Sequence, residues 1–275
     1  MKTYHLTWAT VGRQPAFPTE SARRDVLSAI ARVGGRDIVL FAIVDDHVHI
    51  VAIVEPERLG RLRASVSRVL GARSAAPIAS SRVTPVETRQ HAENLVKYSL
   101  NQFEHHGLSD DPAVATGSCF PDIVGARRVP GLSLQLSAAL PRFRKREAYA
   151  VVGIADELQP ATDADVRGLG PVRLADLVAQ TFAIAPGYVG NTPTVAMARR
   201  VAARLAADVG IRPCDIALPL GITPIAAARL VKRVVDEESI RAVRLRIALE
   251  FAASVRPAKP LVVSESDASA YGVAD

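Results

Sequence analysis

The chain has 275 residues, 49% of them hydrophobic, and a net charge of +6 at pH 7, which predicts one large or two modest domains. No uncharged run is long enough to span a membrane, the first residues lack the apolar core of a signal peptide, and the two cysteines form no CxxC pair, so we expect a cytoplasmic protein without a membrane partner or a disulfide framework. The whole net charge lies in residues 1–150, which contain 20 Lys and Arg against 14 Asp and Glu, and such an excess attracts polyanions.

The first half of the chain alternates strand and helix patterns. Hydrophobic periodicity and turn residues predict a strand at residues 3–10, a helix at 21–33, a buried strand at 37–44, a two-residue hairpin turn at Asp45-Asp46, a strand beginning at His47, a helix at 57–70, a short strand at 78–83 and a helix that contains Tyr98. This order predicts an α+β fold, and more specifically a ferredoxin-like antiparallel sheet with helices on one face.

Two histidines stand two positions apart on the strand that follows the hairpin turn. Because side chains alternate along a strand, His47 and His49 point to the same face and are neighbours in space. Neutral imidazoles are common metal ligands, and such a pair needs only a third ligand from elsewhere to form an open metal site. We therefore expect this face to line a cleft. The alternative interpretation is a histidine pair at a solvated strand end.

The helix that contains Tyr98 has a clear start in the sequence. Thr84 is the expected N-cap, Pro85 occupies the first helical position, and Glu87 completes a capping box. Gly107 is expected to end the helix.

Tyr98 and Gln102 lie one helical turn apart, so this helix offers a phenol hydroxyl and a neutral amide oxygen on one face. The alternative interpretation is a half-buried tyrosine with a glutamine at the rim, as on any amphipathic helix. Two imidazoles and an amide oxygen would form a neutral ligand set suited to Mg²⁺ or Mn²⁺.

In this order, the His-Val-His strand and the Tyr98 helix resemble the single-tyrosine HUH transposases, the family that includes the REP-associated tyrosine transposases. The resemblance covers about the first half of the chain. It implies that His47, His49 and Gln102 bind one divalent cation and that Tyr98 is the nucleophile. It also implies that the protein cleaves and rejoins single-stranded DNA, in a hairpin or palindrome, through a 5′-phosphotyrosine intermediate. The run after Gln102 differs from the Asn-Pro-Val-Arg of the REP-associated branch.

The second half of the chain predicts a separate helical domain. A short helix at residues 213–218, a turn around Gly221 and a helix opened by Thr223-Pro224 form a helix-turn-helix pattern. The block from Ala198 to Thr223 is similar to the C-terminal DNA-binding domain of bacterial replication initiators. The resemblance implies contacts to duplex DNA, for which the sequence offers Thr223, Arg229, Lys232 and Arg233. The alternative is a helical bundle that binds no DNA.

Between these halves the chain is basic and interrupted by prolines. The expected layout is a nuclease domain at residues 1–126, a basic linker at 127–160, a helix-turn-helix domain at 161–254 and a tail at 255–275. The linker offers six cations that could grip a DNA strand, or it could be a solvated connection: Arg127, Arg128, Arg142, Arg144, Lys145 and Arg146.

Three functions fit these patterns. The first is a DNA transposase or single-strand endonuclease, associated with the nucleoid and acting as a monomer or homodimer. The second is a DNA-binding regulator that keeps the fold of a transposase but does not cut. The third is a metal-dependent hydrolase that acts through water, in which Tyr98 is only structural.

Overall fold

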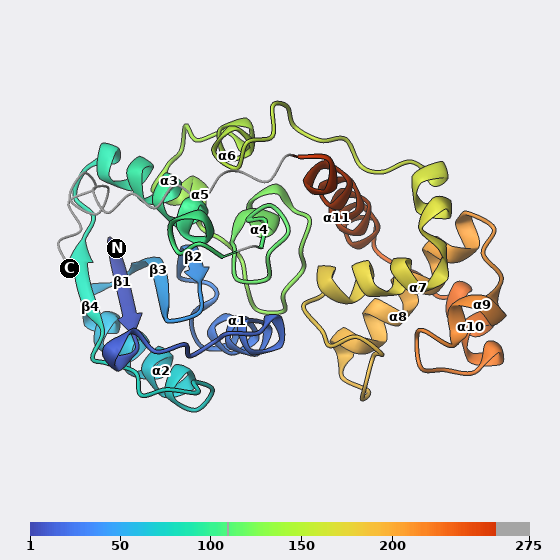
Figure 1. Cartoon of the computed structure of the whole chain (residues 1–275), viewed down its shortest axis with the longest axis horizontal. Coiled ribbons are helices and arrows are strands. Elements are labelled where there is room, and N and C mark those ends of the chain that lie inside the picture. The colour runs from blue at the N-terminus through green and yellow to red at the C-terminus, as the bar shows by residue number, and fades with distance from the viewer. Residues whose placement is uncertain (109, 257–275) are drawn as a thin grey trace. The chain divides into compact units, whose positions relative to one another are not determined.

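The computed structural model describes residues 1–108 and 110–256, and it divides into two compact units (Figure 1). The first unit comprises residues 1–124 and 131–157 together with Arg256, and the second comprises residues 125–130 and 158–255. An antiparallel sheet and numerous helices confirm the predicted α+β class. The layout predicted from sequence, with a linker at 127–160, remains a prediction. Residues 257–275 of the predicted tail lie outside the described residues.

The sheet of the first unit has four strands in the order β2-β3-β1-β4, and each neighbouring pair is antiparallel. Its strands are β1 (Lys2–Ala9), β2 (Ile38–Ile43), β3 (His47–Val54) and β4 (Arg82–Pro85). The predicted hairpin between β2 and β3 is confirmed. Its two-residue turn, Asp45-Asp46, is closed by a hydrogen bond from Val44 N to His47 O of 3.1 Å.

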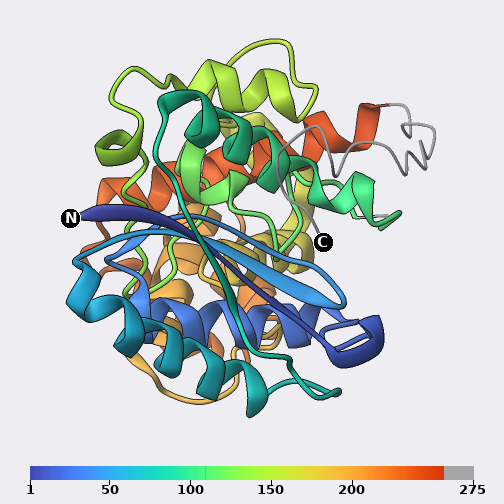
Figure 2. The same cartoon turned by 90° about the vertical axis from the view of Figure 1, so that its left-hand side faces the viewer.

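Helices cover both faces of this sheet, which corrects the prediction that they all lie on one face. Helices α1 (Glu20–Gly34) and α2 (Pro56–Gly71) share one face, where Trp8 Nε1 of β1 donates to Ser67 Oγ of α2. Helix α3 (Arg89–His105) lies against the face that carries His47 and His49 (Figure 2). The physical reason is visible in β3, which is buried on both faces and therefore needs cover on both.

Helix α3 begins later than its sequence signal predicts. Residues 82–85 form β4, and Val86 N continues this extended stretch with a hydrogen bond to Thr3 O, so pairing with β1 outcompetes the predicted cap at Thr84. The N-cap is Thr88, whose hydroxyl accepts from His91 N. The predicted end is confirmed, because Gly107 has a left-handed φ of 62° and its N–H bonds back to Glu104 O.

The outer edge of β2 is covered by loops from later in the chain. Ile43 N donates to Gly117 O at 2.9 Å, and Gln135 N donates to Ile38 O at 2.8 Å. These contacts pair backbone groups that would otherwise be free on an edge strand, and they hold the strand that leads into the hairpin. Short helical segments complete the unit: η1 (Val11–Arg13), α4 (Phe120–Val124), α5 (Leu136–Ala139) and α6 (Lys145–Val151).

The second unit is entirely helical in the part that the structure describes, and its core is rich in alanine, valine and leucine. Its helices are α7 (Asp163–Thr181), α8 (Pro193–Asp208), α9 (Pro213–Ala217), α10 (Pro224–Val231) and α11 (Glu237–Val255). Helix α7 bends at Gly170-Pro171, where Gly170 has a φ of 69°. The turn between α9 and α10 contains Gly221 with a φ of 62°.

Among the described residues, no helix combines the length and apolar character needed to cross a membrane.

We predict opposite effects of two Gly→Ala substitutions on the first unit. A Cβ at Gly117 would lie 2.0 Å from Ile43 O, so Gly117→Ala must push the loop off β2 and should lower the free energy of unfolding by about 1–3 kcal/mol. Gly60 is exposed within α2 and a Cβ there meets nothing within 4 Å, so Gly60→Ala should raise it by about 0.5–1 kcal/mol. Denaturant unfolding measures both, and equal effects would contradict the account of the β2 edge.

Candidate functional site

The four residues singled out by the sequence motifs meet between β3 and α3. Tyr98 Oη lies 3.5 Å from His49 Nε2, and Gln102 Oε1 lies 3.1 Å from His47 Nε2. The two histidines are two residues apart on β3, and Tyr98 and Gln102 are four residues apart on α3. These two separations have similar lengths, so each imidazole faces one side chain of α3. The structure therefore brings together every residue predicted for the nucleophile and the metal site.

Hydrogen bonds fix the direction of the Gln102 amide and of the His47 ring. The Gln102 Nε2 group donates to Tyr98 O at 3.3 Å, which turns Oε1 toward His47. On its other side, the His47 ring bonds through Nδ1 to the Asp46 carboxylate. A proton on Nδ1 leaves a lone pair on Nε2, and this lone pair faces the lone pairs of the Gln102 oxygen. Only a cation or a second proton between the two atoms makes that contact favourable, and this donor set fits a divalent metal ion.

His49 is oriented by β1, a contribution that the sequence motifs do not reveal. Its Nδ1 lies 3.0 Å from His5 Nε2 and 3.2 Å from Thr7 Oγ1, both on the neighbouring strand. When Nδ1 carries the proton, Nε2 presents a lone pair toward Tyr98. His5 could have been found from sequence, because it alternates onto the same face of the predicted first strand.

The two histidines predicted for the metal site are buried, so the expectation that they line a cleft is wrong for them. His47 and His49 have 2% and 3% of their surface exposed, because α3 packs over this face of the sheet. Gln102 is also fully buried, whereas Tyr98 is half-buried. Access to the imidazole nitrogens therefore requires displacement of a side chain of α3 or of the helix itself.

The environment keeps most of the clustered imidazoles neutral at pH 7. Burial lowers the pKa of His5 to about 4, assisted by the nearby charges of His91 and Arg82. Burial also lowers the pKa of His49 well below its ordinary value, and burial with the charge of His47 lowers the pKa of His106 to about 4. Neutral imidazoles are the form that binds a metal.

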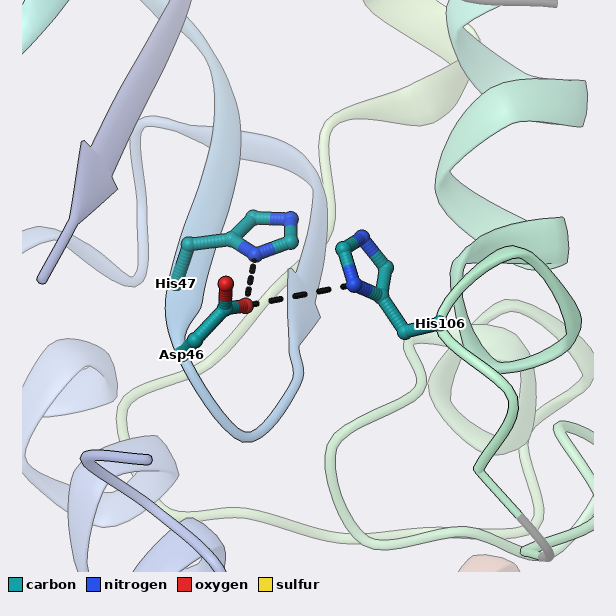
Figure 3. A group of neighbouring side chains, drawn as sticks. All are labelled: Asp46, His47 and His106. Atoms are coloured by element: carbon teal, nitrogen blue, oxygen red, sulfur yellow. Dashed lines mark hydrogen bonds and ion pairs between the residues drawn. The ribbon is translucent and has the colours of Figure 1, made fainter. Parts of the chain in front are cut away.

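Asp46 and His106 extend the cluster beyond the predicted residues (Figure 3). His106 Nδ1 lies 4.0 Å from Asp46 Oδ1, and its ring contacts the ring of His47 at a centroid distance of 4.4 Å. Burial by itself raises the pKa of Asp46, but the hydrogen bond from His47 and the charges around it hold that pKa below its ordinary value. The sequence does carry a signal for His106, which follows Gln102 by four residues and is the C-cap of the helix that contains Tyr98.

The basic residues of the predicted linker differ in their exposure. Arg127 is buried, with 5% of its surface exposed, and is therefore not available as a surface contact. Arg128 is exposed and pairs with Glu238 at 2.7 Å. Exposed cations on or next to helix α6 are Arg142, Arg144, Lys145 and Arg146, of which Lys145 donates to Val124 O at 3.2 Å.

The second unit contains a groove between α8 and α10 with a basic rim. The groove has a volume of about 320 Å³ and its four arginines are Arg199, Arg200, Arg229 and Arg233. Arg199 is held by backbone carbonyls, including Tyr188 O at 2.6 Å. Of the predicted contacts, Arg229, Lys232 and Arg233 are exposed, and the Thr223 hydroxyl caps α10 by accepting from Ala226 N.

Neither a scan against models of protein families nor a search of curated proteins finds a match to this chain.

The depressed pKa of His5 predicts that acid destabilises the first unit. In the unfolded chain, His5 takes up a proton below its ordinary pKa of 6.5. In the folded protein, His5 stays neutral until the pH falls to about 4, the lowered pKa. In the presence of a chelator, the free energy of unfolding should therefore fall from pH 6.5 to 4, with about 3 kcal/mol of that fall due to His5. His5→Gln should remove this part of the pH slope, as followed by urea unfolding at successive pH values. Exposed His105→Gln is the control, and equal slopes in both variants would contradict the assignment.

Proposed function

We propose that this protein is a metal-dependent endonuclease or transposase that cleaves and rejoins single-stranded DNA through Tyr98. The observation that carries the proposal is the convergence of Tyr98 and Gln102 of α3 on His49 and His47 of β3. A phenol nucleophile, two imidazoles and an inward-facing amide oxygen are the parts that such a reaction needs. The resemblance of these motifs to single-tyrosine HUH transposases points to the same chemistry.

The reaction is a transesterification at a backbone phosphate. The Tyr98 oxygen forms a bond to phosphorus and the bond from phosphorus to the 3′ oxygen breaks, while the phenol loses a proton and the departing oxygen gains one. His47, His49 and Gln102 would hold Mg²⁺ or Mn²⁺, which when bound polarises a non-bridging phosphate oxygen. Because the phosphotyrosine keeps the energy of the phosphodiester, a second 3′ hydroxyl can reverse the step without ATP.

Asp46 and His5 would orient the imidazoles of His47 and His49 by contacts to their Nδ1 atoms. Asp46 accepts from Nδ1 of His47, and His5 contacts Nδ1 of His49, so both Nε2 atoms are directed toward α3. Partners of this kind fix the tautomer and the orientation of ligating histidines. Since both imidazoles are buried, the DNA strand would enter beside the half-buried Tyr98 and displace part of α3.

The architecture of the two units is compatible with this function. The antiparallel strand order β2-β3-β1-β4, with α1 and α2 on one face, supports a ferredoxin-like assignment for the first unit. Helices α9 and α10, joined by a turn, support a helix-turn-helix in the second. The substrate would be a DNA hairpin or palindrome, with duplex contacts through α10, in the cytoplasm at the nucleoid.

A second candidate is a DNA-binding protein with the same fold that does not cut. The burial of His47 and His49 favours it, because both rings already have polar partners within the protein. In that case the histidine cluster would stabilise the packing of α3 on the sheet. Formation of a covalent protein–DNA adduct separates the two candidates.

We predict that Tyr98→Phe abolishes covalent capture of a single-stranded hairpin oligonucleotide. The substitution removes only the hydroxyl of a half-buried side chain, so binding of the oligonucleotide should change by less than about fivefold, since a single hydrogen bond contributes about 1 kcal/mol or less. Denaturing gel electrophoresis measures capture and fluorescence anisotropy measures binding. An adduct that persists in the phenylalanine variant would disprove the role of Tyr98.

We predict that His47→Ala and His49→Ala remove Mn²⁺-dependent cleavage, since each deletes a proposed ligand. Loss of one oriented ligand should lower the affinity for Mn²⁺ by at least about tenfold, which electron paramagnetic resonance measures directly. Thermal unfolding in chelator is the control for the fold. Wild-type cleavage that continues in excess chelator would contradict the metal role.

The second unit generates a prediction of its own. Because Arg229 and Lys232 are exposed on and just after α10, replacing both with Ala should weaken duplex binding and reduce the salt slope by about one unit for each lost phosphate contact. Cleavage of a short unstructured oligonucleotide should hardly change. A salt titration of duplex binding tests this, with exposed Arg204→Ala on α8 as the matched control. Equal salt slopes for the wild type and the double variant would indicate that the second unit is a scaffold and does not contact duplex DNA through α10.

A further inference from the structure

Asp46 and His106 lie next to the His47 ring (Figure 3), and Asp46 bonds to Nδ1 of that ring, whereas Gln102 faces Nε2. We propose that Asp46, His47 and His106 form a second metal position, selective for a transition-metal ion such as Zn²⁺, which excludes a metal ion from the site between His47 and Gln102. Binding of Zn²⁺ at this position does not depend on the proposed function. Its consequence, inhibition of DNA cleavage by Zn²⁺, rests on the proposed function.

The three ligand atoms are already close to the geometry that such an ion needs. One ligand atom from each residue lies within 4.8 Å of the other two, and His106 Nδ1 is 4.0 Å from Asp46 Oδ1. With metal–ligand bonds of about 2.0–2.2 Å, two ligands of a tetrahedral ion lie roughly 3.4 Å apart. His106 therefore has to approach Asp46 by less than about 1 Å, and the short Asp46–His47 contact has to open by a similar amount.

The ligand set favours a borderline-soft ion over Mg²⁺. Two imidazoles and one carboxylate suit Zn²⁺, Fe²⁺ or Co²⁺, and three protein ligands leave a position for water. Two of the three ligands lie at positions where the backbone can shift to bind an ion. Asp46 lies in the hairpin turn, and His106 is the C-cap of α3 rather than an interior helical residue.

The two metal positions exclude each other through one proton. An ion on Nδ1 of His47 moves the ring proton to Nε2, and this Nε2–H then donates to Gln102 Oε1 across 3.1 Å. The first site thereby loses two of its three ligands, His47 and Gln102. In the opposite state, the proton is on Nδ1 of His47, and this N–H donates a hydrogen bond to Asp46. Two ligands of the second position, His47 Nδ1 and Asp46, are then occupied by each other.

Arg13 opposes an ion at the second position. Its Nη1 lies 3.3 Å from Asp46 Oδ2 and 3.4 Å from His47 Nδ1, so its charge repels a cation there. The side chain is 57% exposed and can turn into solvent. Arg13→Gln should therefore tighten Zn²⁺ binding by several-fold, whereas binding of Zn²⁺ at the first site, through Nε2 of His47, would respond much less.

Titration calorimetry of the metal-free full chain with Zn²⁺ tests the second position. We expect one equivalent in the wild type, affinity at least about tenfold weaker in His106→Ala, and wild-type affinity in His105→Ala, which changes the neighbouring exposed histidine. Absence of binding by the wild type, two equivalents, or equal binding by His106→Ala and wild type would overturn the proposal.

The tautomer of His47 provides a readout that needs no variant. Nitrogen-15 chemical shifts of the Zn²⁺-loaded wild type should show metal on Nδ1 and a proton on Nε2. Metal on Nε2 would overturn the proposal.

The inhibition has a separate test. Zn²⁺ should slow Mg²⁺-dependent cleavage in the wild type by a larger factor than in His106→Ala, and equal factors would overturn the regulatory part. Absence of cleavage from every sample would overturn the proposed function and its inhibition, while the Zn²⁺ position itself is decided by the titration.

Discussion

The contact between His47 Nε2 and Gln102 Oε1 is the constraint on which the first unit depends. When the ring proton of His47 is on Nδ1, two acceptor atoms face each other in a buried interface, and a cation or a second proton has to lie between them. On either side, Asp46 and Tyr98 O fix which atoms face inward. The proposed site therefore lies within the interface that packs α3 on the sheet. A metal ion at this contact would stabilise the fold and activate the substrate together.

Strand and helix periodicity predicted much of the first unit because local signals and tertiary contacts agree there. The Asp45-Asp46 turn, the alternation that places His47 beside His49, and the end of α3 at Gly107 all depend on residues close in sequence. The start of α3 was mispredicted because Thr84-Pro85 carries a good cap signal, yet pairing with β1 holds it extended. No local pattern records that competition.

The parts of the site that sequence missed are supplied by distant residues. His5 reaches His49 across the β1–β3 pairing, and His106 reaches Asp46 only because α3 crosses the sheet. The prediction of an open cleft failed for the same reason, since exposure depends on which face α3 covers. In the second unit, the Thr223-Pro224 cap predicted the start of α10, but the groove between α8 and α10 arises from tertiary packing.

The central claim is that Tyr98 becomes covalently attached to DNA at a site built from β3 and α3. Mass spectrometry of protease-digested protein after reaction with a single-stranded hairpin and Mn²⁺ tests it most directly. The account predicts a peptide that carries a nucleotide 5′-phosphate on Tyr98, together with an equal amount of product ending in a 3′ hydroxyl. Cleaved DNA with a free 5′-phosphate and an unmodified Tyr98, or an adduct on another residue, would contradict it.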